Sequence, residues 1–407
     1  MIEIIEAKEH EEIEVNDECK KKLEKLFKES KKFHSYLKLN KEFKVGYIIG
    51  IEWLTNEFVL VVEPKIENLN YLSMFLECLK HPVVLNEINK DNDEKVYEIF
   101  LDEKPIDLET TRLEITPLLI VHFLYVVRSI VKKGLMKRYV KVQENLTNKI
   151  KGKILISPSI KYNHLKNRSN KNYCEYYNFT IDCPENRILK KALLFANNYL
   201  IRYQISTNTD PLPIINQCLS AFSLVSEEVD INTIKSIKVN SFFKEYKDGL
   251  TLAKMILKYF GYSIHNIESK KHSIPPFYIN MPKLFELFVY SKLIEYKNEN
   301  IVYQPQGNYG QPDFIDINNK IIIDTKYKEN YSVSYDIEDI RQLSGYARDE
   351  KILKKLNNNS NENVVKCLII YPDVNGNDTM KNDWFSNKID GFLQFYKYGL
   401  KLSTYSR

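Results

Sequence analysis

The sequence predicts a multidomain protein of the α/β (α+β) class, whose C-terminal part is a central mixed sheet flanked by helices and is preceded by a β-rich and helical region. Three observations support this fold class. The chain has 407 residues, more than one ordinary hydrophobic core holds, so two or three domains are expected. Its apolar content of 43 % and aromatic content of 12 % are ample for packed cores. Residues 282–402 contain apolar segments in the order helix, three strands, helix, two strands.

The first segment, residues 1–115, is predicted to be a β-rich module. Residues 41–66 hold two apolar runs separated by Thr55-Asn56, which is the pattern of a hairpin. Residues 69–79 carry apolar side chains at helical spacing, and residues 90–115 indicate short strands and loops.

The second segment, residues 116–274, is predicted to be a helical and β region with a basic stretch. Its expected elements are helices at 116–136 and 186–201 and a strand at 149–157. Residues 132–171 contain twelve Lys or Arg and one acid, Glu144. Such a local field attracts a phosphate backbone or an acidic partner surface, although a solvated basic face gives the same pattern.

Composition excludes several classes of protein. The six cysteines form no CxxC pair and have no histidine at metal-ligand spacing, so neither a disulfide framework nor a zinc site is expected. The N-terminus lacks an apolar signal-peptide core. The most apolar run, residues 117–131, is short and interrupted by His122 and Arg128, which favours a buried helix over a membrane span. We therefore expect a cytoplasmic protein without membrane association.

The third segment, residues 275–407, follows Pro275-Pro276, the best candidate for a linker. Continuous apolar strands there indicate a central sheet that helices cover on both faces. The predicted helices are residues 282–297 and 336–348, and the predicted strands are residues 301–305, 313–317, 320–328, 364–372 and 391–402.

The hairpin at residues 313–328 places charged residues at one end of this sheet. Asparagine tolerates positive φ, so a two-residue turn at Asn318-Asn319 is expected. That turn pairs Ile317 with Lys320 and Ile315 with Ile322, and it sets Asp313 opposite Asp324.

Strand alternation decides which neighbours share the face of Asp324. Lys326 falls on the same face, whereas Thr325 points the other way and Asp316 lies on the opposite face, outside the site.

Two carboxylates this close repel each other unless a cation lies between them. Mg²⁺ suits hard oxygen ligands and a phosphate substrate. Lys326 could orient or deprotonate an attacking water, or stabilise charge in the transition state. A surface hairpin that ends in an Asp–Lys ion pair has the same spacing, because Asp-x-Lys is common.

Three residues on the flanking helices strengthen the functional interpretation. Glu286 lies among core-type residues of the first helix, and Gln342 and Tyr346 lie four apart on one face of the second. Taken singly, Glu286 fits a helix-surface carboxylate and the other two fit ordinary packing.

This combination resembles the PD-(D/E)xK nuclease superfamily. Pro312-Asp313 matches the PD element, Asp324-Thr325-Lys326 matches (D/E)xK, and Glu286 matches the glutamate of the first helix. The pair Gln342 and Tyr346 looks like the QxxxY of some branches.

The resemblance implies a restriction-endonuclease-like fold and a role for each matching residue. Asp313 and Asp324 would bind the metal with the backbone carbonyl of Thr325, while Lys326 assists the attacking water. Glu286 would act through metal-bound water. Gln342 would serve the catalytic site, and Tyr346 would support that site or contact DNA.

Further segments resemble McrC, the nuclease subunit of McrBC-type modification-dependent restriction systems. They are residues 45–66, 134–154, 179–193, "LFELFVYSKL" and "DTKYK…DIRQLSGYA". The resemblance implies that the N-terminal half, with the β-rich module of residues 1–115, docks on a ring of McrB-like AAA+ GTPase subunits and stimulates GTP hydrolysis. This chain would then cleave double-stranded, methylated DNA with Mg²⁺.

The sequence has no GxxxxGK[ST] phosphate loop, which fits a partner that binds the GTP. Lys65, Arg138 and Arg187 are candidate partner contacts, but solvated or helix-capping bases explain them equally well. Two other functions stay open: a non-catalytic adaptor that activates the AAA+ NTPase, and a stand-alone PD-(D/E)xK nuclease of repair or transposition.

Overall fold

The structure is a computed structural model in which the chain divides into two compact units. The first unit joins Met1–Ile115 to Lys270–Arg407, and the second is Thr116–Ser269. The described residues are 3–29, 35–88, 95–100, 102–108, 115–202, 213–229, 244–263, 272–297, 300–328, 331, 334–357, 364–376 and 384–404.

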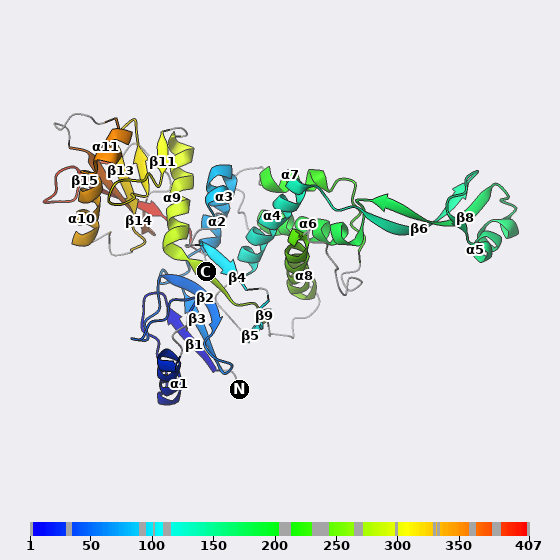
Figure 1. Cartoon of the computed structure of the whole chain (residues 1–407), viewed down its shortest axis with the longest axis horizontal. Coiled ribbons are helices and arrows are strands. Elements are labelled where there is room, and N and C mark those ends of the chain that lie inside the picture. The colour runs from blue at the N-terminus through cyan, green and yellow to red at the C-terminus, as the bar shows by residue number, and fades with distance from the viewer. Residues whose placement is uncertain are drawn as a thin grey trace. The chain divides into compact units, whose positions relative to one another are not determined.

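One sheet of the first unit combines four strands from the N-terminal segment with one strand from much later in the sequence, in the order β1-β3-β2-β10-β4 (Figure 1). These strands are β1 (Glu3–Lys8), β2 (Ile48–Trp53), β3 (Phe58–Glu63), β4 (Tyr97–Ile99) and β10 (Phe277–Asn280). The predicted hairpin is confirmed, because β2 and β3 pair antiparallel with Trp53 opposite Val59. The parallel pairing of β1 with β3 was not expected from the sequence.

Strand β10 lies antiparallel between β2 and β4. Gly50 allows the close approach, because a Cβ there would lie 2.1 Å from the carbonyl oxygen of Phe277. Pro275-Pro276, predicted as a linker, instead lies between β10 and β9 (His272–Ile274), and β9 pairs with β5 (Ile106–Leu108). The two prolines therefore carry the chain from one paired strand to the next.

Helices also pack in this part of the first unit. They are α1 (Asp17–Glu29), α2 (Tyr71–Lys80), α3 (Pro82–Ile88) and α9 (Met281–Lys297). The predicted helix at 69–79 is confirmed as α2, which an ion pair of 2.6 Å between Lys292 and Glu77 links to α9.

The second sheet of this unit has the order β11-β12-β13-β14-β15 and is mixed. Its strands are β11 (Ile301–Tyr303), β12 (Phe314–Asp316), β13 (Ile321–Thr325), β14 (Lys366–Asp373) and β15 (Phe395–Lys401). The first three strands pair antiparallel, and β13, β14 and β15 pair parallel. The predicted succession of helices and strands is confirmed, with one further short helix after α10.

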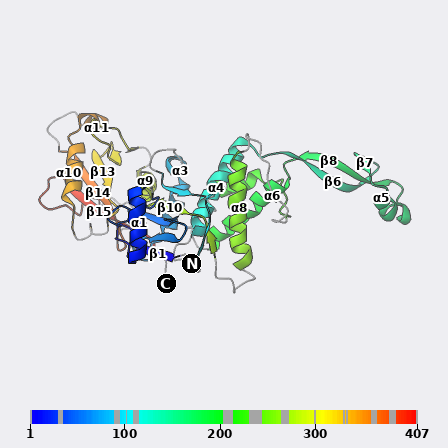
Figure 2. The same ribbon diagram turned by 60° about the horizontal axis from the view of Figure 1, so that its bottom comes forward.

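Helices cover this sheet on both faces, as the sequence predicts (Figures 1 and 2). On one face α9 packs through Tyr290 against Phe314, with ring centroids 5.6 Å apart. On the other face α10 (Ile337–Tyr346) buries Leu343 against Cys367, and α11 (Glu350–Lys355) buries Ile352 against Ile322. The charged ends of β12 and β13 thus lie where α9 and α10 both reach.

The second unit is a helical bundle with a long two-stranded arm (Figure 1). Its elements are α4 (Ile115–Lys133), β6 (Arg138–Thr147), β7 (Lys153–Ile154), α5 (Ile156–Tyr162), a short 3₁₀ helix (His164–Lys166), β8 (Lys171–Thr180), α6 (Pro184–Arg202), α7 (Pro213–Ala221) and α8 (Lys244–Ser263). Helices α4 and α6 match their predictions. The predicted strand at 149–157 shrinks to β7, because α5 begins at Ile156.

The arm pairs β6 with β8 antiparallel over their whole length, from Arg138 opposite Thr180 to Thr147 opposite Lys171. Buried hydrogen bonds fasten its base to the bundle. The Tyr246 hydroxyl donates to Asn186 and accepts from the N–H of Met136, both at 2.8 Å. These bonds fix the start of β6 against α6 and α8.

Within the described ranges, no helix has both the length and the apolar character needed to cross a membrane. Helix α4 contains the apolar run at 117–131, and burial there lowers the pKa of His122 to about 4. All six cysteines are buried, and none of them forms a disulfide.

Candidate nuclease site

The hairpin register agrees with the prediction, whereas the turn does not. Ile315 lies opposite Ile322, and continuing the ladder sets Asp313 opposite Asp324. The turn spans four residues, 317–320, and Lys320 rather than either asparagine adopts positive φ, at 52°. Asp316 explains the difference, because its carboxylate accepts hydrogen bonds from the N–H and the side-chain amide of Asn319. These two hydrogen bonds hold the Asp316 carboxylate at the turn, away from the other charged residues.

Asp313 comes directly before β12, and its carboxylate reaches across to the end of β13. Its Oδ2 accepts a hydrogen bond of 2.7 Å from the N–H of Thr325 and one of 2.5 Å from the hydroxyl. The sequence predicts that Thr325 points away from the site, yet its hydroxyl binds Asp313. Burial and the neighbouring Asp324 raise the pKa of Asp313 to about 7, although both bonds from Thr325 oppose this.

Asp324 is buried at the end of β13, and Lys326 neutralises it. Lys326 Nζ lies 2.5 Å from Asp324 Oδ2. Burial raises the pKa of Asp324 despite the attraction of Lys326. Burial would lower the pKa of Lys326, but the carboxylates of Asp324, Asp339 and Asp313 raise it. Lys326 is therefore held in its protonated form.

Helix α10 fixes the direction of the lysine. Lys326 Nζ donates to Gln342 Oε1 at 2.9 Å, and Gln342 Nε2 donates to the Tyr346 hydroxyl at 2.9 Å. Gln342 and Tyr346 thus form a chain of hydrogen bonds that ends on Lys326. The structure brings both helix residues to the lysine.

Glu286 is buried on α9 and is held by a separate set of donors. It accepts hydrogen bonds from Lys283 Nζ at 3.0 and 3.1 Å and from Gln304 Nε2 at 2.8 Å. Burial and the charge of Asp313 raise the pKa of Glu286 to about 7. Glu286 consequently lies within electrostatic reach of the two aspartates.

Sequence reasoning missed Asp339, a buried acid in the first turn of α10. Lys328 donates to it at 2.8 Å, the Tyr331 hydroxyl donates to it, and Lys326 Nζ lies 3.7 Å away. An acid in the first turn of a helix is common because of the helix dipole, so this position carried no special signal. Its contacts with Lys326 and Lys328 make it part of the same charge network.

A tight loop precedes Asp313 and packs on Tyr346. Asp349 accepts hydrogen bonds from the backbone N–H groups of Asn308 at 2.6 Å and Tyr309 at 3.1 Å. A Cβ at Gly310 would lie 2.5 Å from the ring of Tyr346, so any other residue there would require the ring to move. The loop thereby links the approach to Asp313 with the residue that supports Gln342.

The chemistry of the donors fits a hard divalent cation. Asp313 and Asp324 supply carboxylate oxygens, and the pKa of both is raised, by burial first and then by neighbouring acids. In the β12–β13 ladder the next hydrogen-bonded position opposite Thr325 is Pro312, which has no N–H to donate to the Thr325 carbonyl. No three His, Cys, Asp or Glu side chains in the described part of the chain lie together as a metal site.

Arg138 and Arg187, considered as partner contacts, have partners within the second unit. Arg138 forms an ion pair with Glu185. Arg187 makes two hydrogen bonds of 2.7 Å to Asp182, in the bidentate geometry typical of arginine and carboxylate. Both residues brace the base of the arm.

Two opposed aspartates, a lysine and a buried helix glutamate lie together at the end of a mixed sheet. The family model described as "McrBC 5-methylcytosine restriction system component" matches residues 43–372. The chain therefore belongs to the McrBC family.

Two solved structures are similar to this chain. One is a chain of the tetradecameric assembly of Thermococcus gammatolerans McrB AAA+ hexamers with bound McrC, 16 % identical with a TM-score of 0.36 over 98 % of this chain and 94 % of that one. The other is a chain of the Thermococcus gammatolerans McrBC complex, 16 % identical with a TM-score of 0.30 over 84 % of this chain and 99 % of that one. Comparison with curated protein sequences finds no match.

Proposed function

We propose that this chain is the DNA-cleaving subunit of a GTP-dependent McrBC-like restriction complex, with a PD-(D/E)xK site in the β11–β15 sheet. The observation that carries the proposal is the convergence of Asp313, Asp324 and Lys326 at the end of two adjacent strands. Holding like charges together in a poorly solvated place lowers stability, and functional sites are where such arrangements concentrate.

The metal in this proposal is Mg²⁺, held by Asp313, Asp324 and the carbonyl of Thr325. When bound, Mg²⁺ would supply charge neutralisation at the phosphodiester and an acidified water. The hydrogen bonds that Thr325 makes to Asp313 keep that carboxylate turned toward the end of β13. The protein's part is to pre-position both carboxylates before the cation arrives.

Lys326 acts as a cationic donor in this mechanism. Because the surrounding acids raise its pKa, it stays protonated near neutral pH and is poorly suited to remove a proton. Its ammonium can hydrogen-bond the attacking water or a phosphate oxygen and stabilise the negative charge that develops there. The hydrogen bonds from Lys326 to Gln342 and from Gln342 to Tyr346 orient the ammonium for this role.

Glu286 is suited to move a proton. A pKa of about 7 leaves the carboxyl partly protonated at neutral pH, where it can accept a proton from water and return it. Lys283 and Gln304 hold its oxygens in place.

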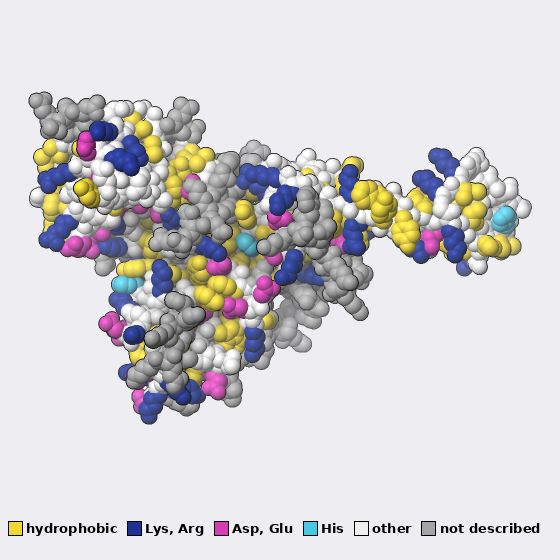
Figure 3. All heavy atoms as spheres, viewed as in Figure 1, with side chains coloured by type: hydrophobic (Ala, Val, Ile, Leu, Met, Phe, Trp, Pro, Cys, Tyr) yellow, Lys and Arg dark blue, Asp and Glu magenta, His cyan; other side chains and the backbone are white. Residues whose placement is uncertain are grey.

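The partner in this proposal is a McrB-like AAA+ GTPase ring, and the arm of the second unit is its docking element. The arm exposes Tyr139, Tyr177 and Phe179 by 71, 66 and 56 % of their surfaces. Both apolar and basic side chains lie on the face of the arm that Figure 3 shows. Aromatic side chains left in water on an extended two-stranded arm are typical of a protein-binding surface. The partner would bind GTP, and the complex would act on DNA that contains 5-methylcytosine.

The test is cleavage of methylated double-stranded DNA by the complex reconstituted with its AAA+ partner, GTP and Mg²⁺. We expect Asp313→Ala and Lys326→Ala to abolish cleavage while GTPase stimulation by this chain is retained. A complete wild-type complex that never nicks DNA but stimulates the GTPase would favour the adaptor. Robust cleavage by the isolated chain would favour a stand-alone repair or transposition nuclease.

A further inference from the structure

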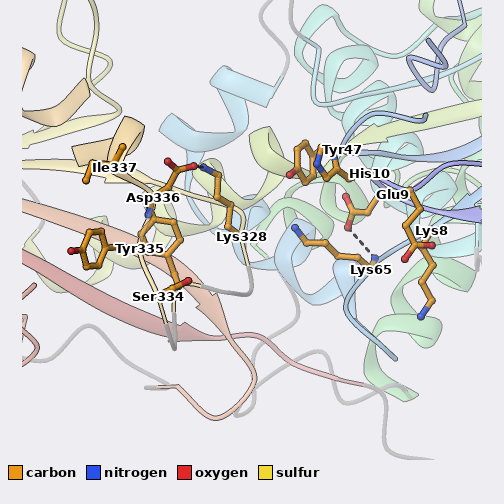
Figure 4. Close-up of a pocket in the computed structure, with 12 residues that line it drawn as sticks. Lys8, Glu9, His10, Tyr47, Lys65, Lys328, Ser334, Tyr335, Asp336 and Ile337 are labelled. Atoms are coloured by element: carbon orange, nitrogen blue, oxygen red, sulfur yellow. Dashed lines mark hydrogen bonds and ion pairs between the residues drawn. The ribbon is translucent and has the colours of Figure 1, made fainter. Parts of the chain in front are cut away.

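A pocket of about 670 Å³ lies in the first unit, between its N-terminal residues and the segment that leaves the candidate site. Figure 4 shows Glu9, Lys65 and Tyr47 on one side of this pocket and Lys328 and Asp336 on the other. Tyr327, the residue between Lys326 and Lys328, connects the two sides through hydrogen bonds.

Glu9 and Lys65 bind Tyr327 at both its hydroxyl and its carbonyl. Glu9 Oε1 accepts a hydrogen bond of 2.9 Å from the Tyr327 hydroxyl and one of 3.1 Å from the N–H of Lys65. Lys65 Nζ donates to the Tyr327 carbonyl at 2.9 Å. The same ammonium lies 4.5 Å from the centre of the Tyr327 ring and 4.7 Å from that of Tyr47, which are cation–π distances.

These contacts matter because the backbone hydrogen bonds between β13 and β14 end at Lys326. The N–H of Lys326 still donates to the carbonyl of Ile370 at 2.9 Å. In this parallel register the Lys326 carbonyl would accept from residue 372, but Pro372 has no N–H. That carbonyl accepts instead from the N–H of Lys328 at 2.8 Å, a short turn outside the sheet. The position of the backbone after Lys326 therefore depends on Glu9 and Lys65, the residues that bind Tyr327.

The two flanking lysines point to the opposite side from Tyr327. Lys326 reaches Asp324 and Gln342, and Lys328 donates to Asp336 at 2.9 Å. A shift of Tyr327 would therefore move the Lys326 backbone, and the lysine ammonium with it, relative to the two aspartates.

We infer that Glu9 and Lys65 are positioning residues that set the place of Lys326 through Tyr327. They join the N-terminal β module to the strand that carries the catalytic lysine. This inference rests on the proposed nuclease function. It also assigns Lys65, a candidate partner contact on sequence grounds, to a contact inside this chain.

The experiment compares Lys65→Met, Lys65→Arg and Tyr327→Phe in the reconstituted complex. We expect Lys65→Met to lower the single-turnover cleavage rate about 10- to 100-fold, because small misplacements of a catalytic group have effects of this size. Tyr327→Phe removes only the bond to Glu9 and should lower the rate a few-fold, while Lys65→Arg keeps a donor and should recover part of the rate. DNA affinity and stimulation of the partner GTPase should stay at wild-type levels.

The matched control is Lys22→Met in the same module. Lys22 forms an exposed ion pair of 2.8 Å with Glu57, a residue that does not bind Tyr327, and the variant should cleave normally. Wild-type cleavage by Lys65→Met would overturn the inference alone. A loss of cleavage that is matched by lost GTPase stimulation and a lower unfolding temperature would also overturn it, since that is a structural role. If the wild-type complex does not cleave, the proposed function fails and the inference falls with it.

Discussion

Replacing Asp313 by asparagine should stabilise the first unit above pH 7 and abolish DNA cleavage. The asparagine amide keeps an oxygen to accept the two hydrogen bonds from Thr325, and its neutrality removes the repulsion between Asp313 and Asp324. The substitution therefore separates the electrostatic cost of the carboxylate from its packing.

The magnitude follows from the pKa of Asp313, which is raised from 3.8 to about 7. The folded state then binds a proton that the unfolded state has released, so the free energy of unfolding falls as pH rises between these values. At about 1.4 kcal/mol per pKa unit, the upper bound is on the order of 4 kcal/mol above pH 7. Because Asp313 and Asp324 titrate together, we expect a net gain of about 1–3 kcal/mol for the variant at pH 8.

The assay is urea unfolding of the two proteins in EDTA at pH 8 and at pH 4. The advantage of Asp313→Asn should be large at pH 8 and should shrink toward zero at pH 4. Asp316→Asn is the matched control on the same strand, because Asp316 serves the turn, and it should show no such gain. An Asp313→Asn protein that is equally destabilised at both pH values would refute the electrostatic reasoning.

Three further predictions test other parts of the structure. Gln342→Ala removes the acceptor of Lys326 and should lower cleavage about 10-fold or more with an unchanged unfolding midpoint, whereas Gln342→Glu keeps an acceptor and should lose less. Gly310→Ala places a Cβ 2.5 Å from the Tyr346 ring. We expect it to lower cleavage, and to lower the free energy of unfolding by about 1–3 kcal/mol in denaturant titrations. A variant with unchanged cleavage and stability would contradict this packing contact. The double variant Tyr139→Ser/Phe179→Ser should lose co-purification with the AAA+ partner and keep its circular dichroism; retained binding would exclude these aromatic residues as a docking surface.

The hairpin register was predictable because its physical cause is local. Apolar residues on both strands leave one register in which Asp313 and Asp324 reach the same end, and Ile315 does lie opposite Ile322. The turn itself was mispredicted, since the bond from Asn319 to Asp316 stabilises a four-residue turn that local spacing does not reveal.

The other elements that the sequence did not predict are pairings between segments far apart in the chain and strands without a clear hydrophobic pattern. Strand β10 pairs with β2 and β4, which lie far earlier in the chain, and only tertiary packing selects that pairing. The arm was missed because β6 and β8 are largely exposed and lack the alternation of buried and polar residues that identifies strands. The hydrogen bonds from Glu9 and Lys65 to Tyr327 join residues that are 318 and 262 positions apart, so spacing could not indicate them.

The most direct test of the nuclease site is strand cleavage by the complex that contains Asp324→Asn, measured with Mg²⁺, GTP and methylated DNA. Asp324 is the buried carboxylate that pairs with Lys326, so its loss removes a metal ligand and the counter-charge of the lysine together. We expect no detectable nicking beside a wild-type complex that cleaves, with equal GTPase stimulation by both. Cleavage by Asp324→Asn at the wild-type rate would contradict the assignment of this site.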